Sequence, residues 1–421
     1  MNREKTTKPK RSLHVAVFTD YYLPTLGGIQ TSVKAQKEAL EEQGHKVTIF
    51  CPGHLPSNDI SVVRLPTLKR IKPDGYPVAG TAKKVIEHAR LEVGQRKDID
   101  IIHAHSDMVT GVAGLVVAKE YGIPSVQTMH GREDVYAVKV LPIPAISSSI
   151  LTILHSRYIP HRGTRIDATG AQAQSVTARR MWRLMVSHAN FADGVIVPSR
   201  HFAKKLQRYG VIRPVSIVSN GIEKTVMSKI GHVKPRNYYA TKPLKIMWCG
   251  RVSPEKRPLE FLQGIKQLTL DVKVDMYGDG VYLKRVQKFI KKNNLGGRIT
   301  AHGPVDQDII LREMARHHLL VYSSFDFDNQ PMVLLEAIAT GLPVVYCDPD
   351  LGETIPSKGS ILSDGPDPTA IANSIKSVIA HPSSIKAMSV AMLESRNAIR
   401  QSHQTMSLIS VYRKTIQNHN P

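Results

Sequence analysis

Short apolar runs separated by helix-length stretches dominate the pattern along the chain. The first run, residues 13–19 (LHVAVFT), is followed by a glycine-containing loop and a helical pattern that extends to about Gln43. The next run, Lys46–Cys51 (KVTIFC), follows the Gly44-His45 pair. Continuously apolar runs, as opposed to alternating ones, are typical of parallel strands buried on both faces. The pattern therefore predicts βαβ units.

The same pattern recurs through both halves of the chain. Further strands of the first half are expected at residues 100–104, 125–129, 194–198 and 215–218. In the second half they are expected at residues 244–249, 272–277, 298–302, 319–323 and 343–347. A turn signal, Ser219-Asn220-Gly221-Ile222, lies between the two series. The sequence thus predicts an α/β protein with two Rossmann-like domains.

The length of the chain supports this division, since 421 residues exceed a typical single domain. We expect a first domain over residues 1–218 and a second over 219–399. A helix at about 400–421 is expected to pack back on the first domain.

Charge narrows the range of partners. The chain carries 57 Lys+Arg against 35 Asp+Glu, a net charge of +22, which attracts nucleic acid, lipid headgroups or phosphorylated substrates. Between Arg157 and Arg213 the only acids are Asp167 and Asp193. Zinc-ligand spacing, an RNP-like motif and a basic heptad region are all missing from the sequence, so no nucleic-acid partner is expected.

The location follows from three features of composition. Residues 1–11 are polar and basic, unlike a secretory signal. The three cysteines share no metal-ligand spacing and each ends a short apolar run, which is typical of buried thiols in a reducing compartment. The longest uncharged stretch, Val140–Ser156, is too short to span a bilayer. We expect a cytoplasmic protein that lies peripherally on the inner face of the cell membrane.

Two candidate anion sites follow predicted strands. Gly27-Gly28 comes after the first strand, where glycines let backbone N–H groups approach a phosphate. Arg251 and Lys256 follow the first strand of the second half, and together they could neutralise a diphosphate. Each signal alone is equally typical of an ordinary turn or a solvated surface.

The most informative segment runs from Asp328 to Glu336 (DNQPMVLLE). Pro331 suits the first turn of a helix, so the amides from Asn329 to Val333 are expected to point outward, toward an anion or a sugar. Carboxylates here could accept hydrogen bonds from vicinal hydroxyls. Asp326-Phe-Asp328 also resembles a metal-binding D-x-D pair, but one acidic pair is weak evidence, and we expect no metal.

Three histidines follow strands of the first half: His103, His105 and His130. A histidine at such a position is more often a satisfied polar residue than a catalyst. His130 is the strongest candidate, because Gly131 permits close approach of a ligand.

Taken together and in order, several segments resemble glycosyltransferase family 4 over nearly the whole chain. They are FTDYYLPTLGGIQ, IIHAHS, the Asn220-Gly221-Ile222 linker, GRVSPEKRP and DNQPMVLLEAIATGLPVV. The resemblance implies a GT-B fold and a hexosyltransferase that uses a nucleotide sugar with retention of anomeric configuration and without a metal. The family's E-x7-E motif would have glutamate at position 328, where this chain has aspartate.

The resemblance also implies roles for individual residues. Glu336 would bind the ribose hydroxyls, Arg251 and Lys256 the diphosphate, and Gly28 a phosphate oxygen. His130 and Asp328 would contact the donor sugar, assisted by the amides near Asn329 and Met332. The first domain would bind the acceptor, and the leaving phosphate would take the acceptor proton.

The acceptor prediction depends on residues 138–186. An apolar run, Leu141–Leu154, precedes arginines in a combination that suits a membrane-surface enzyme. These arginines are Arg157, Arg162, Arg165, Arg179, Arg180 and Arg183. A core helix with a solvated basic flank gives the same pattern. Bacterial enzymes that glucosylate diacylglycerol look similar, so we predict transfer of glucose from UDP-glucose to a membrane lipid.

The same sequence features fit other acceptors and other classes of protein. The acceptor could be a soluble or phosphorylated sugar or a cell-envelope polysaccharide precursor. A non-catalytic protein that binds nucleotide sugars or nucleic acid belongs to a different class. A dinucleotide-dependent oxidoreductase should show G-x-G-x-x-G after the first strand, and this chain has only Gly27-Gly28.

Overall fold

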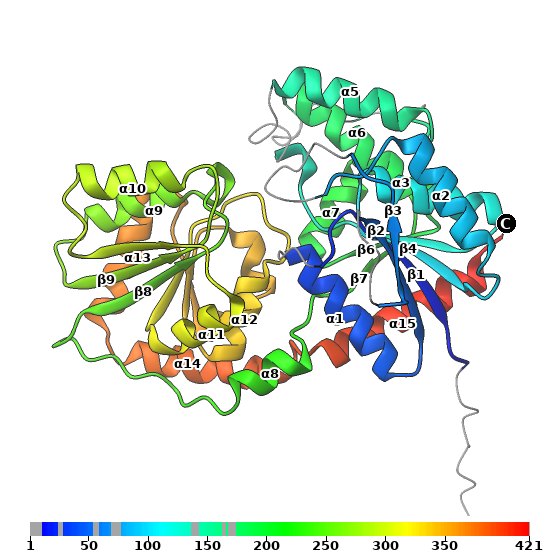
Figure 1. Ribbon diagram of the computed structural model, residues 1–421. Coiled ribbons are helices and arrows are strands. Elements are labelled where there is room, and N and C mark those ends of the chain that lie inside the picture. Colours follow the sequence, from blue (N-terminus) through cyan, green and yellow to red (C-terminus); the bar gives the residue numbers. More distant parts are fainter. Residues whose placement is uncertain are drawn as a thin grey trace, which may run out of the picture.

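The computed structural model describes residues 11–23, 28–53, 59–68, 77–135, 143–161, 166 and 174–420. Two α/β domains lie side by side, each built around a parallel β-sheet with helices on both faces (Figure 1). The predicted fold class is therefore confirmed. No helix in the described part of the chain is both long and apolar enough to cross a membrane.

The first sheet has the strand order β3-β2-β1-β4-β5-β6-β7. Its strands are β1 (His14–Phe18), β2 (Lys46–Pro52), β3 (Val62–Leu65), β4 (Ile101–Ala104), β5 (Ser125–Thr128), β6 (Gly194–Val197) and β7 (Val215–Ile217). The helices of this half are α1 (Gly28–Glu42), α2 (Ala82–Gly94), α3 (Val109–Tyr121), α5 (Pro144–Ser156), α6 (Val176–Phe191) and α7 (Arg200–Arg208).

Alternate residues of β1 face opposite helical layers, as the period of a strand requires. Val15 and Val17 pack with α1 and with α15 (Gln401–Asn418), whereas Ala16 and Phe18 pack with α2 and α3. Both faces of the sheet are therefore buried, which is why its strands appear in the sequence as continuous apolar runs.

The second sheet has the order β10-β9-β8-β11-β12-β13. Its strands are β8 (Leu244–Cys249), β9 (Val272–Tyr277), β10 (Ile299–Gly303), β11 (Leu319–Tyr322), β12 (Val344–Tyr346) and β13 (Ser360–Leu362). The α-helices are α8 (Lys224–Ile230), α9 (Pro258–Lys266), α10 (Leu283–Lys292), α11 (Gln307–Arg316), α12 (Met332–Thr340), α13 (Pro368–Ala380) and α14 (Ser384–Glu394). Short 3₁₀ turns are η3 (Pro254–Lys256), η4 (Pro349–Glu353), η5 (Ser357–Gly359) and η6 (Ser395–Asn397).

The sequence pattern missed two strands, β3 and β13. Both are short and lie at an outer edge of their sheet. An edge strand pairs on one side only and buries less surface, so it needs no long apolar run to form.

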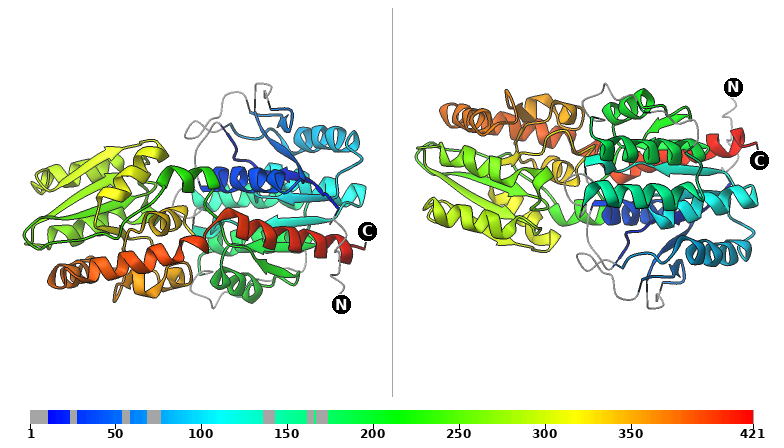
Figure 2. Two further views of the ribbon diagram at one scale, coloured as in Figure 1. Left: turned by 90° about the horizontal axis from the view of Figure 1, so that it is seen from below. Right: turned by 90° about the horizontal axis from the view of Figure 1, so that it is seen from above.

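The chain crosses between the domains twice, and the two crossings are bonded together. The amide of Ile222 donates to the carbonyl of Ile399 (2.7 Å), and the amide of Gln401 donates to the carbonyl of Ile222 (3.0 Å). A Cβ on Gly221 would lie 2.5 Å from Cα of Gln401, so only glycine fits there. Beyond this point α15 runs back along the first domain beside α1 (Figure 2).

Candidate functional site

The cleft between the domains brings together the starts of α1 and α12. A Cβ placed on Gly28 would lie 4.0 Å from Cγ of Met332. Both helices follow the carboxyl ends of parallel strands, where ligands bind in open α/β sheets. Two N-terminal helix ends with outward N–H groups therefore share one site, which favours an anionic ligand. Gly27 lies outside the described residues.

The segment before α12 is fastened to the first domain. The side-chain amide of Asn329 donates to the carbonyl of His130 (3.0 Å). The backbone amide of Asn220 donates to Oε1 of Gln330 (2.6 Å), and its side chain donates to the carbonyl of Gln330 (3.2 Å). The hydroxyl of Ser32 in α1 donates a hydrogen bond to Oδ1 of Asn220 (3.0 Å). The structure thus places His130 and Asn329 in direct contact.

Asp328 is occupied by partners from its own domain. Lys256 donates to Oδ1 (2.5 Å), while Tyr322 and Ser324 donate to Oδ2 (2.6 and 2.5 Å). Burial alone would raise the pKa of Asp328, but the Lys256 ammonium and these hydrogen bonds hold it below its usual value. The carboxylate is therefore charged and orients Lys256. Its expected contact with a donor sugar stays a prediction.

Glu336, in the second turn of α12, has a different environment. It is 8% exposed, and Gln307 of α11 donates to its Oε1 (2.7 Å). Burial raises the pKa of Glu336, and the bond from Gln307 opposes that rise. Among the described residues no hydrogen bond reaches Oε2. That oxygen is therefore available to accept from a hydroxyl group, as the ribose assignment requires.

Arg251 stands at the rim of the cleft, immediately after Gly250. Its side chain is exposed and makes no ion pair with any described residue. Lys256, by contrast, is only 15% exposed and lies 5.2 Å from the centre of the Phe327 ring. One cation is fixed and the other is free, and both lie on the strand-to-helix connection that follows β8.

His130 follows β5 in the first domain and is partly exposed. Its Nε2 lies 2.8 Å from Nδ1 of His105. Burial lowers the pKa of His130 to about 4, so the ring is neutral near pH 7. A neutral ring can accept or donate one hydrogen bond through its remaining nitrogen.

Sequence reasoning missed the charged residues that follow Gly131. The Arg132 side chain is 2% exposed, forms two bonds to Asp134 (both 2.8 Å), and reaches across the cleft to Asp326 Oδ1 (2.7 Å). Burial and the charge of Asp134 raise the pKa of Glu133 to about 7, and Arg251 opposes the rise. The sequence did contain a signal for these residues, because Arg132, Glu133 and Asp134 directly follow the carboxyl end of a strand.

The D-x-D pair contacts cations of the protein. Asp326 bonds to Arg132 and Lys205, and Asp328 bonds to Lys256. Within the described ranges no group of three or more His, Cys, Asp or Glu side chains could hold a metal ion. Independence from metal stays a prediction.

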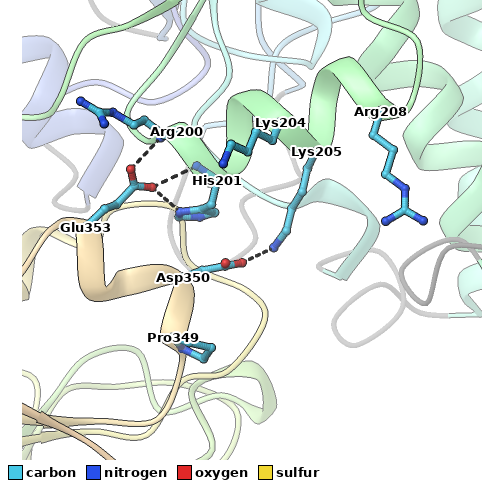
Figure 3. Close-up of a pocket in the computed structure, with 8 residues that line it drawn as sticks. All are labelled: Arg200, His201, Lys204, Lys205, Arg208, Pro349, Asp350 and Glu353. Carbon is cyan, nitrogen blue, oxygen red and sulfur yellow. Dashed lines mark hydrogen bonds and ion pairs between the residues drawn. The ribbon is translucent and has the colours of Figure 1, made fainter.

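A second interdomain contact lies where α7 faces η4 across a pocket of about 460 Å³ (Figure 3). Glu353 accepts from the amides of Arg200 and His201 (both 3.0 Å) and from the His201 ring (2.6 Å). Lys205 pairs with Asp350 (2.7 Å). A carboxylate of the second domain thus caps the start of α7 in the first.

Comparison with known families matches both halves of the chain. Residues 26–225 match the family described as Glycosyltransferase Family 4. Residues 234–397 match the family described as Glycosyl transferases group 1. The residues assigned to the cleft fall within these two ranges.

Relatives and solved structures extend over most of the chain. Alpha-monoglucosyldiacylglycerol synthase of Streptococcus pneumoniae is 24% identical in an alignment of 370 positions that covers 82% of this chain and 74% of the relative. The GDP-mannose-dependent alpha-mannosyltransferase of Mycobacterium tuberculosis is 24% identical, with 81% of this chain and 80% of the relative covered. The crystal structure of Anabaena Alr3699/HepE in complex with UDP-glucose has a TM-score of 0.66 at 16% identity, covering 96% of this chain and 100% of that one.

Proposed function

Since this chain belongs to glycosyltransferase family 4 and has the GT-B fold, we propose that it transfers glucose from UDP-glucose to a membrane lipid such as diacylglycerol, with retention of anomeric configuration. The chain is a nucleotide-sugar-dependent glycosyltransferase. The observation that carries the proposal is the exposed apolar face of α5, on the same domain that contributes the start of α1 to the interdomain cleft.

The second domain and α1 provide the donor site. Oε2 of Glu336 accepts from the ribose hydroxyls, and Arg251 and Lys256 neutralise the diphosphate. The amides at the starts of α1 and α12 add partial positive charge on either side. Because Asp328 fixes Lys256 at 2.5 Å, this ammonium needs no reorganisation when the donor binds.

These groups also account for the transfer step. Cleavage of the anomeric C–O bond leaves positive charge on the sugar and negative charge on the diphosphate. Arg251, Lys256 and the helix-start amides stabilise that negative charge. The acceptor hydroxyl attacks the face from which the diphosphate leaves, and a departing phosphate oxygen takes its proton. His130 contacts the donor sugar, with Asn329 holding its backbone in place (3.0 Å).

The acceptor is inferred from α5, which lies on the outside of the first domain with α6 beneath it (Figure 1). Four apolar side chains repeat at helical spacing along its exposed face: Ile146 (55% exposed), Ile150 (52%), Ile153 (58%) and Leu154 (47%). Such a stripe without a protein partner suits the boundary between headgroups and acyl chains. Leu141, Arg162 and Arg165 lie outside the described residues.

Cations border this apolar stripe. Arg157 ends α5, Arg183 projects from α6, and both are exposed. Arg180 instead donates to the carbonyl of Ala145 (3.0 Å) and so fastens the start of α5 to α6. An apolar helix flanked by exposed arginines matches an anionic bilayer, which supports a peripheral position on the membrane.

A panel of donors and acceptors tests the proposal. The purified protein would be incubated with UDP-glucose, UDP-galactose or GDP-mannose and with vesicles that contain diacylglycerol, and products would be identified by mass. We expect glucosyldiacylglycerol from UDP-glucose, formed roughly a thousandfold more slowly by a Glu336→Gln variant. Transfer from GDP-mannose alone, as the name of one relative suggests, would overturn the donor assignment. Products formed only on soluble sugars would overturn the acceptor.

A further inference from the structure

A chain of hydrogen-bonded side chains links the C-terminal helix to His130. Tyr412 of α15 lies 2.6 Å from Nδ1 of His103. His103 Nδ1 also lies 3.2 Å from Nε2 of His105, whose Nδ1 lies 2.8 Å from Nε2 of His130. The far side of His103, Nε2, lies 2.6 Å from Oγ1 of Thr128. His103, His105 and Tyr412 are all buried, so water cannot substitute for these bonds.

The three hydrogen-bonded histidines His103, His105 and His130 carry no charge near pH 7. Burial lowers the pKa of His103 to about 3 and of His130 to about 4, and it lowers that of His105 well below its usual value. Each ring therefore has one N–H group and one bare nitrogen. Once the direction of one bond is known, the direction of every other bond follows.

Tyr412 sets that direction. Burial raises the pKa of Tyr412 well above 10, so it keeps its proton. A phenol is a stronger acid than a threonine hydroxyl or an imidazole N–H group, so it donates to His103 Nδ1. In the reverse arrangement the Tyr412 proton would have no acceptor among the described residues, which is costly at a fully buried position.

The remaining protons then follow in order. His103 Nδ1 is bare and has one lone pair, which Tyr412 approaches to 2.6 Å and His105 Nε2 to 3.2 Å. The longer contact is a hydrogen bond to this shared acceptor only when His105 carries its proton on Nε2. His105 Nδ1 is then bare and accepts from Nε2–H of His130. Nδ1 of His130 is left as a bare nitrogen, and no described residue bonds to it. That nitrogen can accept a hydrogen bond from a hydroxyl, and it cannot bond to an unprotonated phosphate oxygen.

We propose that Tyr412, His103 and His105 are positioning residues that hold His130 in its Nε2–H tautomer, so that its Nδ1 accepts a hydrogen bond from a hydroxyl of the donor sugar. The sugar contact rests on the proposed function, whereas the tautomer does not. The proposal gives α15 a part in the site, because the seating of a helix that follows the second domain in sequence determines which atom His130 presents to the cleft.

Nitrogen NMR of the ligand-free protein tests the tautomer directly. In protein labelled with ¹⁵N-histidine at neutral pH, we expect His103, His105 and His130 each to carry the proton on Nε2. A proton on Nδ1 of His130, or a charged ring, would overturn the proposal. Because no donor is present, this result does not depend on whether the proposed function is correct.

Tyr412→Phe tests whether the Tyr412 hydroxyl fixes the proton positions on the three histidines, since the variant removes the hydroxyl and keeps the ring. We expect mixed tautomers at His103, His105 and His130, with unchanged signals from His155 and His188, a separate buried pair in the same domain (3.2 Å apart). Tyr209→Phe, at another buried tyrosine of this domain, serves as the matched control and should leave all five signals unchanged. Unchanged signals at His103, His105 and His130 in Tyr412→Phe would remove Tyr412 from the mechanism.

Donors that each lack one sugar hydroxyl test the function of the bare nitrogen. With the wild type, we expect one such donor to lose about tenfold in kcat/KM, the worth of a single hydrogen bond. In His105→Leu that loss should disappear, and in His105→Asn, whose amide can accept from His130 and donate to His103, it should return. An equal loss in wild type and His105→Leu would show that His105 acts only on stability.

Discussion

The cleft between the domains and the outer face of α5 on the first domain differ in how their polar groups are satisfied. In the cleft, Asp328 has three donors, Arg132 bonds to two carboxylates, and Asn329 is tied across to His130. On α5, four apolar side chains are about half exposed, and the adjacent Arg157 has no ion pair with a described residue.

This difference separates a preorganised site from a surface that awaits a partner. Charges fixed before the ligand arrives stabilise a developing charge without reorganisation. Exposed apolar groups and unpaired cations gain free energy only when something covers them. Changes in the cleft should therefore alter turnover with any acceptor, and changes on α5 should alter only the use of membrane-bound acceptors.

The largest expected effect is at Glu336. Glu336→Gln keeps the shape of the side chain and its burial, but removes the charged oxygen that would accept from ribose. We expect turnover to fall by roughly a thousandfold, because charged hydrogen bonds in a desolvated site are among the strongest. Steady-state kinetics measures the loss, and Glu394→Gln, at the exposed end of α14, is the matched control. Near-normal turnover would remove the ribose role.

The next effect is at Arg132. Arg132→Met leaves the buried Asp134 carboxylate without its partner and also removes the link to Asp326 across the cleft. We expect the free energy of unfolding to fall by about 3 kcal/mol, the typical cost of breaking a buried ion pair. Thermal and urea unfolding would measure it, with Arg90→Met, which breaks the exposed pair with Glu120, as control. An equal, small loss in both variants would contradict the buried-pair argument.

A smaller effect, on membrane binding, is expected from the α5 face. Reversing Arg157 and Arg183 to Glu should weaken sedimentation with phosphatidylglycerol vesicles by at least about tenfold, since each surface cation contributes about 1 kcal/mol. Arg180 is left intact because it holds α5 in place. Affinity for the nucleotide sugar should not change. Wild-type protein that stays in the supernatant at low salt would count against a lipid acceptor.

A change of pH is expected to alter the affinity for the nucleotide sugar by only a few fold. Glu133 has a pKa of about 7, so it is uncharged below that pH and anionic above it. Once ionised, it competes with the diphosphate for Arg251. Affinity for the nucleotide sugar should therefore fall as the pH rises from about 6 to about 8. Calorimetric titration would measure the fall, and Glu133→Gln should abolish it. A rise in affinity with pH would contradict this assignment.

No effect at all is expected from chelation. Because Arg251, Lys256 and helix-start amides provide positive charge around the diphosphate, turnover should survive EDTA. A strict requirement for Mg²⁺ or Mn²⁺ would instead favour Asp326 and Asp328 as ligands. The cleft would then be incomplete until an ion bound, and so would be less preorganised relative to the α5 face.

The fold could be predicted from apolar runs because strands buried on both faces leave a strong local signal. The edge strands β3 and β13 leave a weak one and were missed. The domain boundary after Val218 stays a prediction. For the site, the sequence identified Lys256 and Asp328, but their direct pairing joins positions 72 residues apart and could only be seen in three dimensions.

Other parts of the site depend on packing that one sequence does not specify. The role of Arg132 depends on Asp326 in the opposite domain, and the order of the histidines depends on Tyr412 from the far end of the chain. The apolar run of α5 fitted both a core helix and a surface helix. Only the exposure of Ile146, Ile150 and Ile153 distinguishes the two.

The return of α15 to the first domain has a consequence for biosynthesis. The core of that domain includes Leu13 and Val15 near the beginning of the chain, together with Leu408, Ile409 and Tyr412 near its end. On a ribosome, domains generally fold as they emerge, with the N-terminal one first. Here the domain that is translated first cannot close its core until α15 has been translated. The second domain, which lies entirely between these segments, can fold earlier, so the order of completion is the reverse of the order of synthesis.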